Sequence, residues 1–160
     1  MSSQHEADEG FLRLAISQAK LAEEMGETPV GAIIVRYGQV IATGHNRREG
    51  DRCALAHAEL LAIRAACGRL GGWRLPHCTL YVTLEPCPMC AGAIINARIP
   101  RVVFGAFDPK AGCFGSVSDF AALAFNHKPQ VLPGLLEDEC AGLLKAFFRG
   151  LRGKGGAGVV

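Results

Sequence analysis

The sequence lacks any long uninterrupted run of apolar residues. A helix that crosses a bilayer needs about 20 of them, so we expect no membrane span. We expect no secretory leader either, because residues 1–10 are polar and acidic, whereas a leader opens with basic residues and continues with apolar ones. Together these absences predict a cytoplasmic protein.

An excess of either charge is absent too, since 17 basic side chains oppose 15 acidic ones for a net charge of +2. Hydrophobic residues make up 49% of the 160 residues, which fits one globular domain with its own core. The charge is unevenly spread, because six acids and two bases give residues 1–28 a charge of −4 and leave +6 for the remainder. Clustered bases can attract phosphates, although clusters this small are also common on ordinary solvated surfaces. They are Arg47, Arg48, Arg52, Arg149, Arg152 and Lys154.

A disulfide framework is not indicated. The seven cysteines are an odd number, in a chain that is neither small nor evidently secreted. Reduced thiols, some of them on a metal, are the better interpretation. Five of the cysteines fit small core residues, although Cys53 precedes His57 by four residues and could approach a metal bound there. These five are Cys53, Cys67, Cys78, Cys113 and Cys140.

Apolar periodicity predicts helices that alternate with strands. The pattern favours a three-layer α/β/α domain, with a central mixed sheet of about five strands and helices on both faces. This domain should occupy residues 1–150, and the basic, glycine-rich residues 151–160 should form a flexible tail. The expected helices span residues 8–25, 57–67, 88–97, 117–125 (weakly) and 137–149. The expected strands span 30–35, 40–43, 79–84, 101–105 and 130–132, with Tyr37-Gly38 as the turn of a hairpin.

Two helix starts carry residues typical of a metal site. His57-Ala58-Glu59 opens one predicted helix, and Pro86-Cys87-Pro88-Met89-Cys90 opens another. Cys87 and Cys90 are three residues apart and therefore share a helix face, where the helix dipole favours the thiolate. With the imidazole of His57 they offer three ligands to Zn²⁺.

The missing fourth ligand is informative. Structural zinc sites are closed by four protein ligands, whereas catalytic sites keep one position for water. The sequence has no second Cys-x-x-Cys pair to close this site, and Glu59 is placed to act as a general base. A lone Cys-x-x-Cys could be a redox pair or a buried helical pair. The joint pattern of His-x-Glu, the 26 intervening residues 60–85 and Pro-Cys-x-x-Cys is instead the motif of zinc nucleobase deaminases.

Around this motif the sequence resembles the cytidine and deoxycytidylate deaminase superfamily, and within it the bacterial members that deaminate adenosine in tRNA. The similarity runs from about residue 10 to residue 150. The passages that carry it are Pro29-Val30-Gly31-Ala32, LYVTLEPCPMCAGAI (80–94), ARIPRVVFGAFDPKAGCFGS (97–116) and Cys140 through Arg149.

The resemblance implies a cytidine-deaminase-like fold and the conversion of adenosine to inosine at the wobble position of a tRNA anticodon. It implies that His57, Cys87 and Cys90 bind zinc and that Glu59 transfers protons. By the same resemblance, Asn46 hydrogen-bonds the purine, although a turn-forming asparagine would fit that position equally well. Asp108 contacts the sugar of a flanking nucleotide, and two subunits form a homodimer that meets the anticodon stem-loop.

The sequence departs from this family at two places. Cys53-Ala54-Leu55 replaces the usual Asp-Pro-Thr, and Phe107 replaces the arginine that commonly precedes the aspartate at 108. Both changes fall near the expected substrate pocket, so they bear on the choice of RNA and leave the zinc chemistry intact.

Two other functions remain compatible with the motif. A deaminase of a free base or nucleoside, such as guanine or cytosine, would have the same zinc site. A non-catalytic zinc protein that only binds RNA would not need its general base, and the presence of Glu59 argues for an enzyme.

Overall fold

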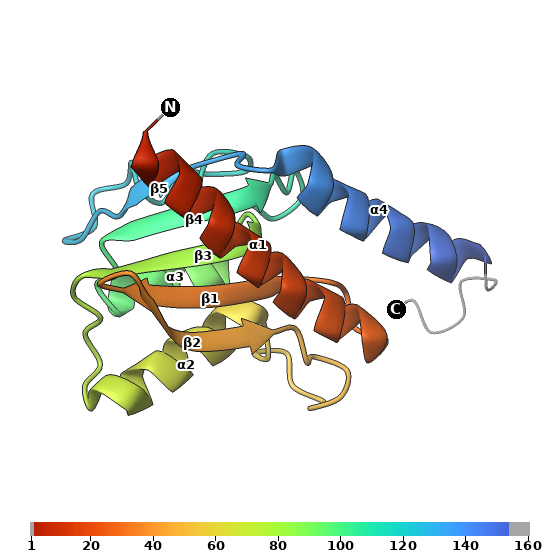
Figure 1. Cartoon of the computed structure of the whole chain (residues 1–160), viewed down its shortest axis with the longest axis horizontal. Helices are drawn as coiled ribbons and strands as arrows, with labels where there is room; N and C mark the ends of the chain where they lie inside the picture. Colours follow the sequence, from red (N-terminus) through yellow and green to blue (C-terminus); the bar gives the residue numbers. More distant parts are fainter. Residues whose placement is uncertain (1, 154–160) are drawn as a thin grey trace.

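The computed structural model describes residues 2–153 (Figure 1). Within these residues, four helices and five strands follow one another. The helices are α1 (Ser3–Glu24), α2 (Ala58–Leu70), α3 (Pro88–Asn96) and α4 (Glu137–Gly153). The strands are β1 (Gly31–Arg36), β2 (Gln39–His45), β3 (Cys78–Leu84), β4 (Arg101–Ala106) and β5 (Gln130–Leu132).

The five strands form one mixed sheet in the order β2-β1-β3-β4-β5. The first two strands make the predicted hairpin, and β1 also pairs antiparallel with β3. The pairs β3–β4 and β4–β5 are parallel. Because β3 and β4 are parallel, the loops that follow them leave the sheet at the same edge.

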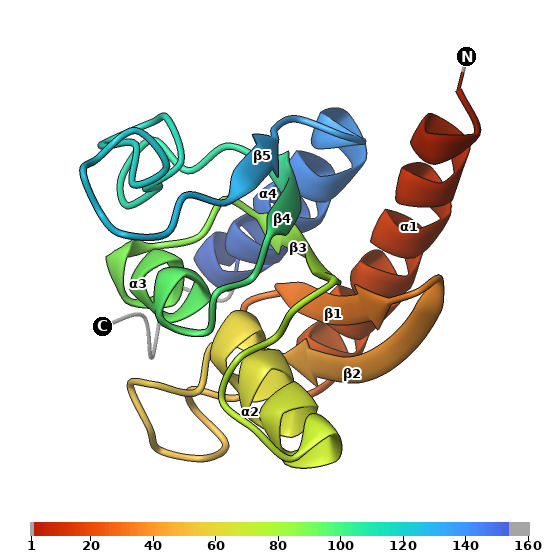
Figure 2. The ribbon, with the colours of Figure 1, turned by 90° about the vertical axis from the view of Figure 1, so that its left-hand side faces the viewer.

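Helices cover both faces of the sheet. Figure 2 shows α2 and α3 on one side of the strands and α1 on the other, where α4 also packs. Successive side chains of a strand point to opposite faces, so Ala32 and Ile34 of β1 enter the core under α2 and α3, whereas Ile33 and Val35 enter the core under α1. The predicted three-layer α/β/α fold is confirmed.

Two glycines allow helices to approach the sheet closely. A Cβ on Gly31 would overlap the backbone of α1, and a Cβ on Gly44 would overlap the backbone at Ala58, where α2 begins. The start of α2 therefore rests directly on β2, which fixes the height of His57 above the sheet.

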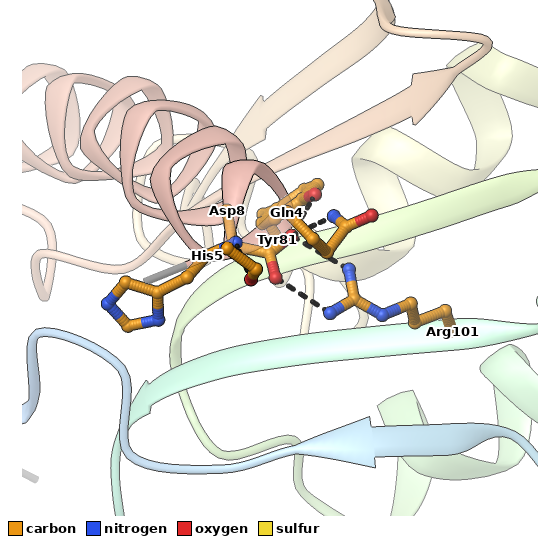
Figure 3. A network of polar contacts seen from close by, with 6 residues as sticks. Gln4, His5, Asp8, Tyr81 and Arg101 are labelled. Atoms are coloured by element: carbon orange, nitrogen blue, oxygen red, sulfur yellow. Dashed lines mark hydrogen bonds and ion pairs between the residues drawn. The ribbon is translucent and has the colours of Figure 1, made fainter.

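The N-terminal half of α1 is held by a polar cluster (Figure 3). The carboxylate of Asp8 accepts two hydrogen bonds from the Arg101 guanidinium, at 2.8 and 2.7 Å, and one from the Tyr81 hydroxyl at 2.7 Å. Gln4 donates a further one at 3.0 Å. Burial alone would raise the pKa of Asp8, but these bonds and the charge of Arg101 hold it below its usual value.

The structure corrects one predicted helix and the ends of two others. Residues 117–125 form turns rather than a helix, because the Phe120 amide bonds the carbonyl of Cys113 and the Asp119 side chain accepts from Ala121. Helix α1 begins at Ser3, where the Ser2 hydroxyl caps the His5 amide. Helix α4 continues to Gly153, beyond its predicted end at residue 149. The rest of the predicted tail lies outside the described residues.

None of the helices in the part of the chain that the structure describes combines the length and apolarity needed to cross a bilayer.

Candidate metal centre and substrate cavity

Three predicted ligands meet at the starts of two helices. His57 is the N-cap of α2, Cys87 is the N-cap of α3, and Cys90 lies in the first turn of α3. Their ligand atoms lie within 4.8 Å of one another. His57 Nδ1 is 3.7 Å from the sulfur of Cys87 and 3.6 Å from that of Cys90.

These distances fit a tetrahedral zinc site. With Zn–S and Zn–N bonds of about 2.3 and 2.1 Å, a tetrahedral angle separates nitrogen from sulfur by about 3.6 Å. Nδ1 rather than Nε2 is the nitrogen that faces the sulfurs. The residues present therefore match Zn²⁺ in both chemistry and spacing.

Electrostatics prepare one thiolate at this centre. A hydrogen bond with Cys90 and the nearness of His57 lower the pKa of Cys87 to about 4, against the opposing effect of burial. The hydrogen bond with Cys87 and burial raise the pKa of Cys90, and the hydrogen bond with Cys87 raises that of His57. The contact between the two sulfurs and the nearby imidazole thus favour a thiolate at this centre.

Glu59 follows His57 by two residues and lies in the first turn of α2. Its side chain is buried, with 4% of the residue exposed, and this burial raises its pKa to about 7. Glu59 also lines the cavity that opens over His57 and Cys87. A carboxyl group in such a position can both accept and release a proton near neutral pH.

The cavity has a volume of about 510 Å³. Its walls come from the loops after β2 and β4 and from one face of α4, which Figure 1 shows extending past the ends of the strands. Polar groups gather around an otherwise apolar lining, as in pockets that take small aromatic ligands. The lining includes Thr28, Val30, Asn46, Arg48, Leu84, Phe107, Asp108, Lys110, Leu144 and Phe148.

Asn46 and Asp108 both line this cavity, and they lie on opposite walls because they follow β2 and β4, which are separated in the sheet by β1 and β3. The Asn46 amide donates to the carbonyl of Thr28 at 3.3 Å and accepts from the backbone of Arg48 at 3.2 Å. One carboxylate oxygen of Asp108 accepts from the amides of Lys110 and Ala111. Each side chain therefore shapes its own loop, and each retains a further hydrogen-bonding position for a ligand.

Sequence reasoning missed two buried carboxylates: Glu85, which lines the cavity, and Glu27, which contacts one of the cavity loops. Each accepts hydrogen bonds from backbone amides of a cavity loop. Nothing in their sequence context separates them from surface acids, apart from the position of Glu85 at the end of an apolar strand, two residues before Cys87. Among residues 2–153, the metal-ligand cluster contains His57, Cys87 and Cys90 but not Cys53.

Comparisons with known proteins agree with this geometry. The family model of MafB19-like deaminases matches residues 6–152. The tRNA-specific adenosine deaminase of Bacillus subtilis is 55% identical over 148 residues, which are 92% of each chain. The enzyme of the same name from Agrobacterium fabrum is 49% identical, over 87% of this chain and 92% of its own.

Solved structures give the same result. A structure from work on A-to-I editing by tRNA:A34 deaminases superimposes with a TM-score of 0.82 at 47% identity, covering 84% of this chain and 99% of the other. A guanine deaminase from Nitrosomonas europaea has a TM-score of 0.74 at 27% identity, over 87% of this chain and 83% of its own.

The three-layer fold, with its ligand triad at two helix starts, defines a deaminase of the cytidine and deoxycytidylate deaminase superfamily. Within that class, the chain belongs to the family of tRNA-specific adenosine deaminases.

Proposed function

We propose that this protein is a zinc-dependent hydrolase that converts adenosine to inosine at the wobble position of a tRNA anticodon. The observation that carries the proposal is the open triad of His57, Cys87 and Cys90 beside the buried Glu59, at the floor of a cavity large enough for a purine. Membership in the family and the similarity to a wobble deaminase structure support tRNA as the substrate.

His57, Cys87 and Cys90 hold Zn²⁺ in this proposal. Zinc with three protein ligands supplies an acidified water as the nucleophile. Two thiolates offset the charge of the ion and so acidify the water less. A protein base is therefore needed to remove a proton from this water. The Glu59 carboxylate would take one proton of this water and deliver it to a purine ring nitrogen as the hydroxide adds at C6. The remaining hydroxyl proton would then pass to the amino group, which leaves as ammonia while the carbonyl of inosine forms.

The remaining residues of the cavity select the substrate. The Asn46 amide hydrogen-bonds an edge of the purine, and Asp108 contacts the sugar of a flanking nucleotide. The unpaired bases of an anticodon loop cost less to extrude into a pocket than paired bases do. Arg48 and Lys110 line the cavity and supply positive charge for phosphates.

We also propose that two copies form a homodimer that meets the anticodon stem-loop, as the family resemblance implies. The domain extent of residues 1–150 and a cytoplasmic location belong to the same proposal, and the absence of a membrane-spanning helix from the described residues is compatible with that location.

The experiment is an incubation of purified, zinc-loaded protein with an unmodified anticodon stem-loop, followed by nucleoside analysis. Inosine should appear at the wobble position. Free adenosine and guanine are assayed in parallel, because the similarity to a guanine deaminase makes a free base the next candidate substrate. Turnover of guanine with unchanged RNA would assign the protein to that second function.

A further inference from the structure

Two carboxylates are buried beneath the two loops that form opposite walls of the cavity. Only 1% of Glu85 and 3% of Glu27 is exposed. A buried carboxylate is costly unless hydrogen bonds or an ion pair compensate for lost hydration. Neither residue takes part in any ion pair within residues 2–153, so hydrogen bonds from the loops provide the compensation.

Glu85 organises the loop after β4. Its carboxylate accepts from the amides of Asp108 at 2.9 Å, Phe114 at 3.0 Å and Ser116 at 3.1 Å, and from the Ser116 hydroxyl. Burial would raise the pKa of Glu85, but these donors hold it below its usual value. A Cβ on Gly112 would overlap this carboxylate, so the loop closes tightly over it.

Glu27 organises the opposite wall in the same way. Its two carboxylate oxygens accept from the amides of Glu49 at 3.0 Å and Gly50 at 2.7 Å. These amides belong to the loop after β2, whose residues Asn46 and Arg48 line the cavity. Backbone amides of each of these two loops therefore bind a buried carboxylate. Neither carboxylate belongs to the cluster of His57, Cys87 and Cys90.

We propose that Glu27 and Glu85 are positioning residues that hold the two walls in the shape that the RNA meets. The inference rests on the proposed function and names the residues that set RNA affinity at the same site. Loops that are already ordered lose little entropy when RNA binds, whereas freed loops must be ordered during binding. The loss of either carboxylate therefore raises KM for RNA, with little change in kcat once the complex has formed.

The primary variants are Glu85→Gln and Glu27→Gln, which keep the side-chain size but present an NH₂ group to amide donors. We expect KM for the anticodon stem-loop to rise about 10-fold in each, with kcat per bound zinc within about two-fold of the parent. The loops share no hydrogen bond with each other's carboxylate, so the double variant should show about a 100-fold rise.

Two further variants separate positioning from general stability. Asp8→Asn changes an equally buried carboxylate, which contacts Arg101 at the start of β4, whereas the cavity loops follow the ends of the strands. It should lower the melting temperature while KM stays unchanged. Gly112→Ala displaces Glu85 without altering its charge, and it should reproduce the rise in KM.

Amide hydrogen exchange gives a readout that needs no activity. Glu85→Gln should speed exchange at Phe114 and Ser116, and Glu27→Gln should speed it at Glu49 and Gly50, with zinc content unchanged. The proposal is overturned if exchange at these amides does not change, if the whole effect falls on kcat, or if Asp8→Asn raises KM equally. A parent enzyme that leaves RNA unmodified would instead refute the proposed function. The exchange data would still test whether Glu27 and Glu85 hold the two loops.

Discussion

Glu59 stands apart from the ligands because its proposed role requires a proton and not a bond to the ion. Its carboxylate is buried in the cavity floor, and its neighbours His57 and Cys87 can hold zinc without it. Zinc retention and catalysis should therefore separate at this residue.

We predict that Glu59→Gln lowers the deamination rate by at least about 10²-fold, the usual contribution of a general acid–base group. Gln has nearly the same size but cannot carry the proton. Zinc content, measured by atomic absorption, should stay at one ion per chain, with His57→Ala as the control that loses both zinc and activity. Near-parental turnover in Glu59→Gln would remove the residue from the mechanism.

The sequence allowed His57, Glu59, Cys87 and Cys90 to be proposed as site residues because ligand chemistry restricts residue type and spacing at once, and the structure brings the three proposed ligands together. Glu27 and Glu85 could not be found in this way. A buried carboxylate is defined by the amides that surround it, and those amides come from residues more than 20 positions away. Asn46 and Asp108 line the cavity, and their roles toward RNA stay predictions.

At the scale of elements, the position of α2 on β2 determines where His57 lies. Gly44 leaves the space into which the backbone at Ala58 fits, so the height of the helix start depends on a residue that takes no part in the chemistry.

We predict that Gly44→Ala displaces this helix start. The added methyl group should cost about 1–3 kcal/mol in the free energy of unfolding, as overpacking usually does. Zinc affinity, measured by competition with a chromophoric chelator, should fall as His57 moves. Gly68→Ala is the control, because Gly68 lies on α2 itself and a Cβ there meets open space. Equal zinc affinities in the two variants would mean that α2 tolerates the shift.

The cluster around Asp8 makes the attachment of α1 dependent on pH. The folded-state pKa of Asp8 lies below its ordinary value of 3.8. Its contribution to stability is therefore fully present above that value and is lost as pH falls through the folded-state pKa.

We predict that Asp8→Asn lowers stability by about 3 kcal/mol at pH 7, because it leaves the partly buried Arg101 without its counter-charge. The difference in melting temperature between parent and variant should hold constant from pH 7 to 5 and shrink below about pH 4. The exposed pair Arg13–Glu139 provides the comparison, since Glu139→Gln should change stability little at any pH. A gap that persists unchanged at pH 3 would contradict this account.

The ends of the elements with strong apolar periodicity were predicted to within about five residues. The short strand β5 was also predicted at its observed position. The helix expected at 117–125 fails because its backbone bonds to residues 112 and 113 and its aspartate caps a turn. Local preference for a helix is weak there, and contacts with the Glu85-bound loop decide the conformation.

At the scale of the whole molecule, the metal site joins segments that are far apart in sequence. His57 follows β2 and Cys87 follows β3, and neither the hairpin nor the β3–α3 unit contains a complete site. A folded chain can bind zinc through all three ligands at once, whereas an unfolded chain holds them apart, so binding must favour the folded state.

We predict that removing zinc with a chelator lowers the melting temperature. At free zinc 100-fold above its dissociation constant, binding contributes about 2.7 kcal/mol of stability, which corresponds to roughly 5–10 °C for a domain of this size. Differential scanning calorimetry should show the loss and its recovery when zinc is added back. Glu59→Gln should respond as the parent does, whereas His57→Ala should not respond, because its triad is incomplete. A zinc response that survives in His57→Ala would place the stabilising ion elsewhere and separate it from the cavity.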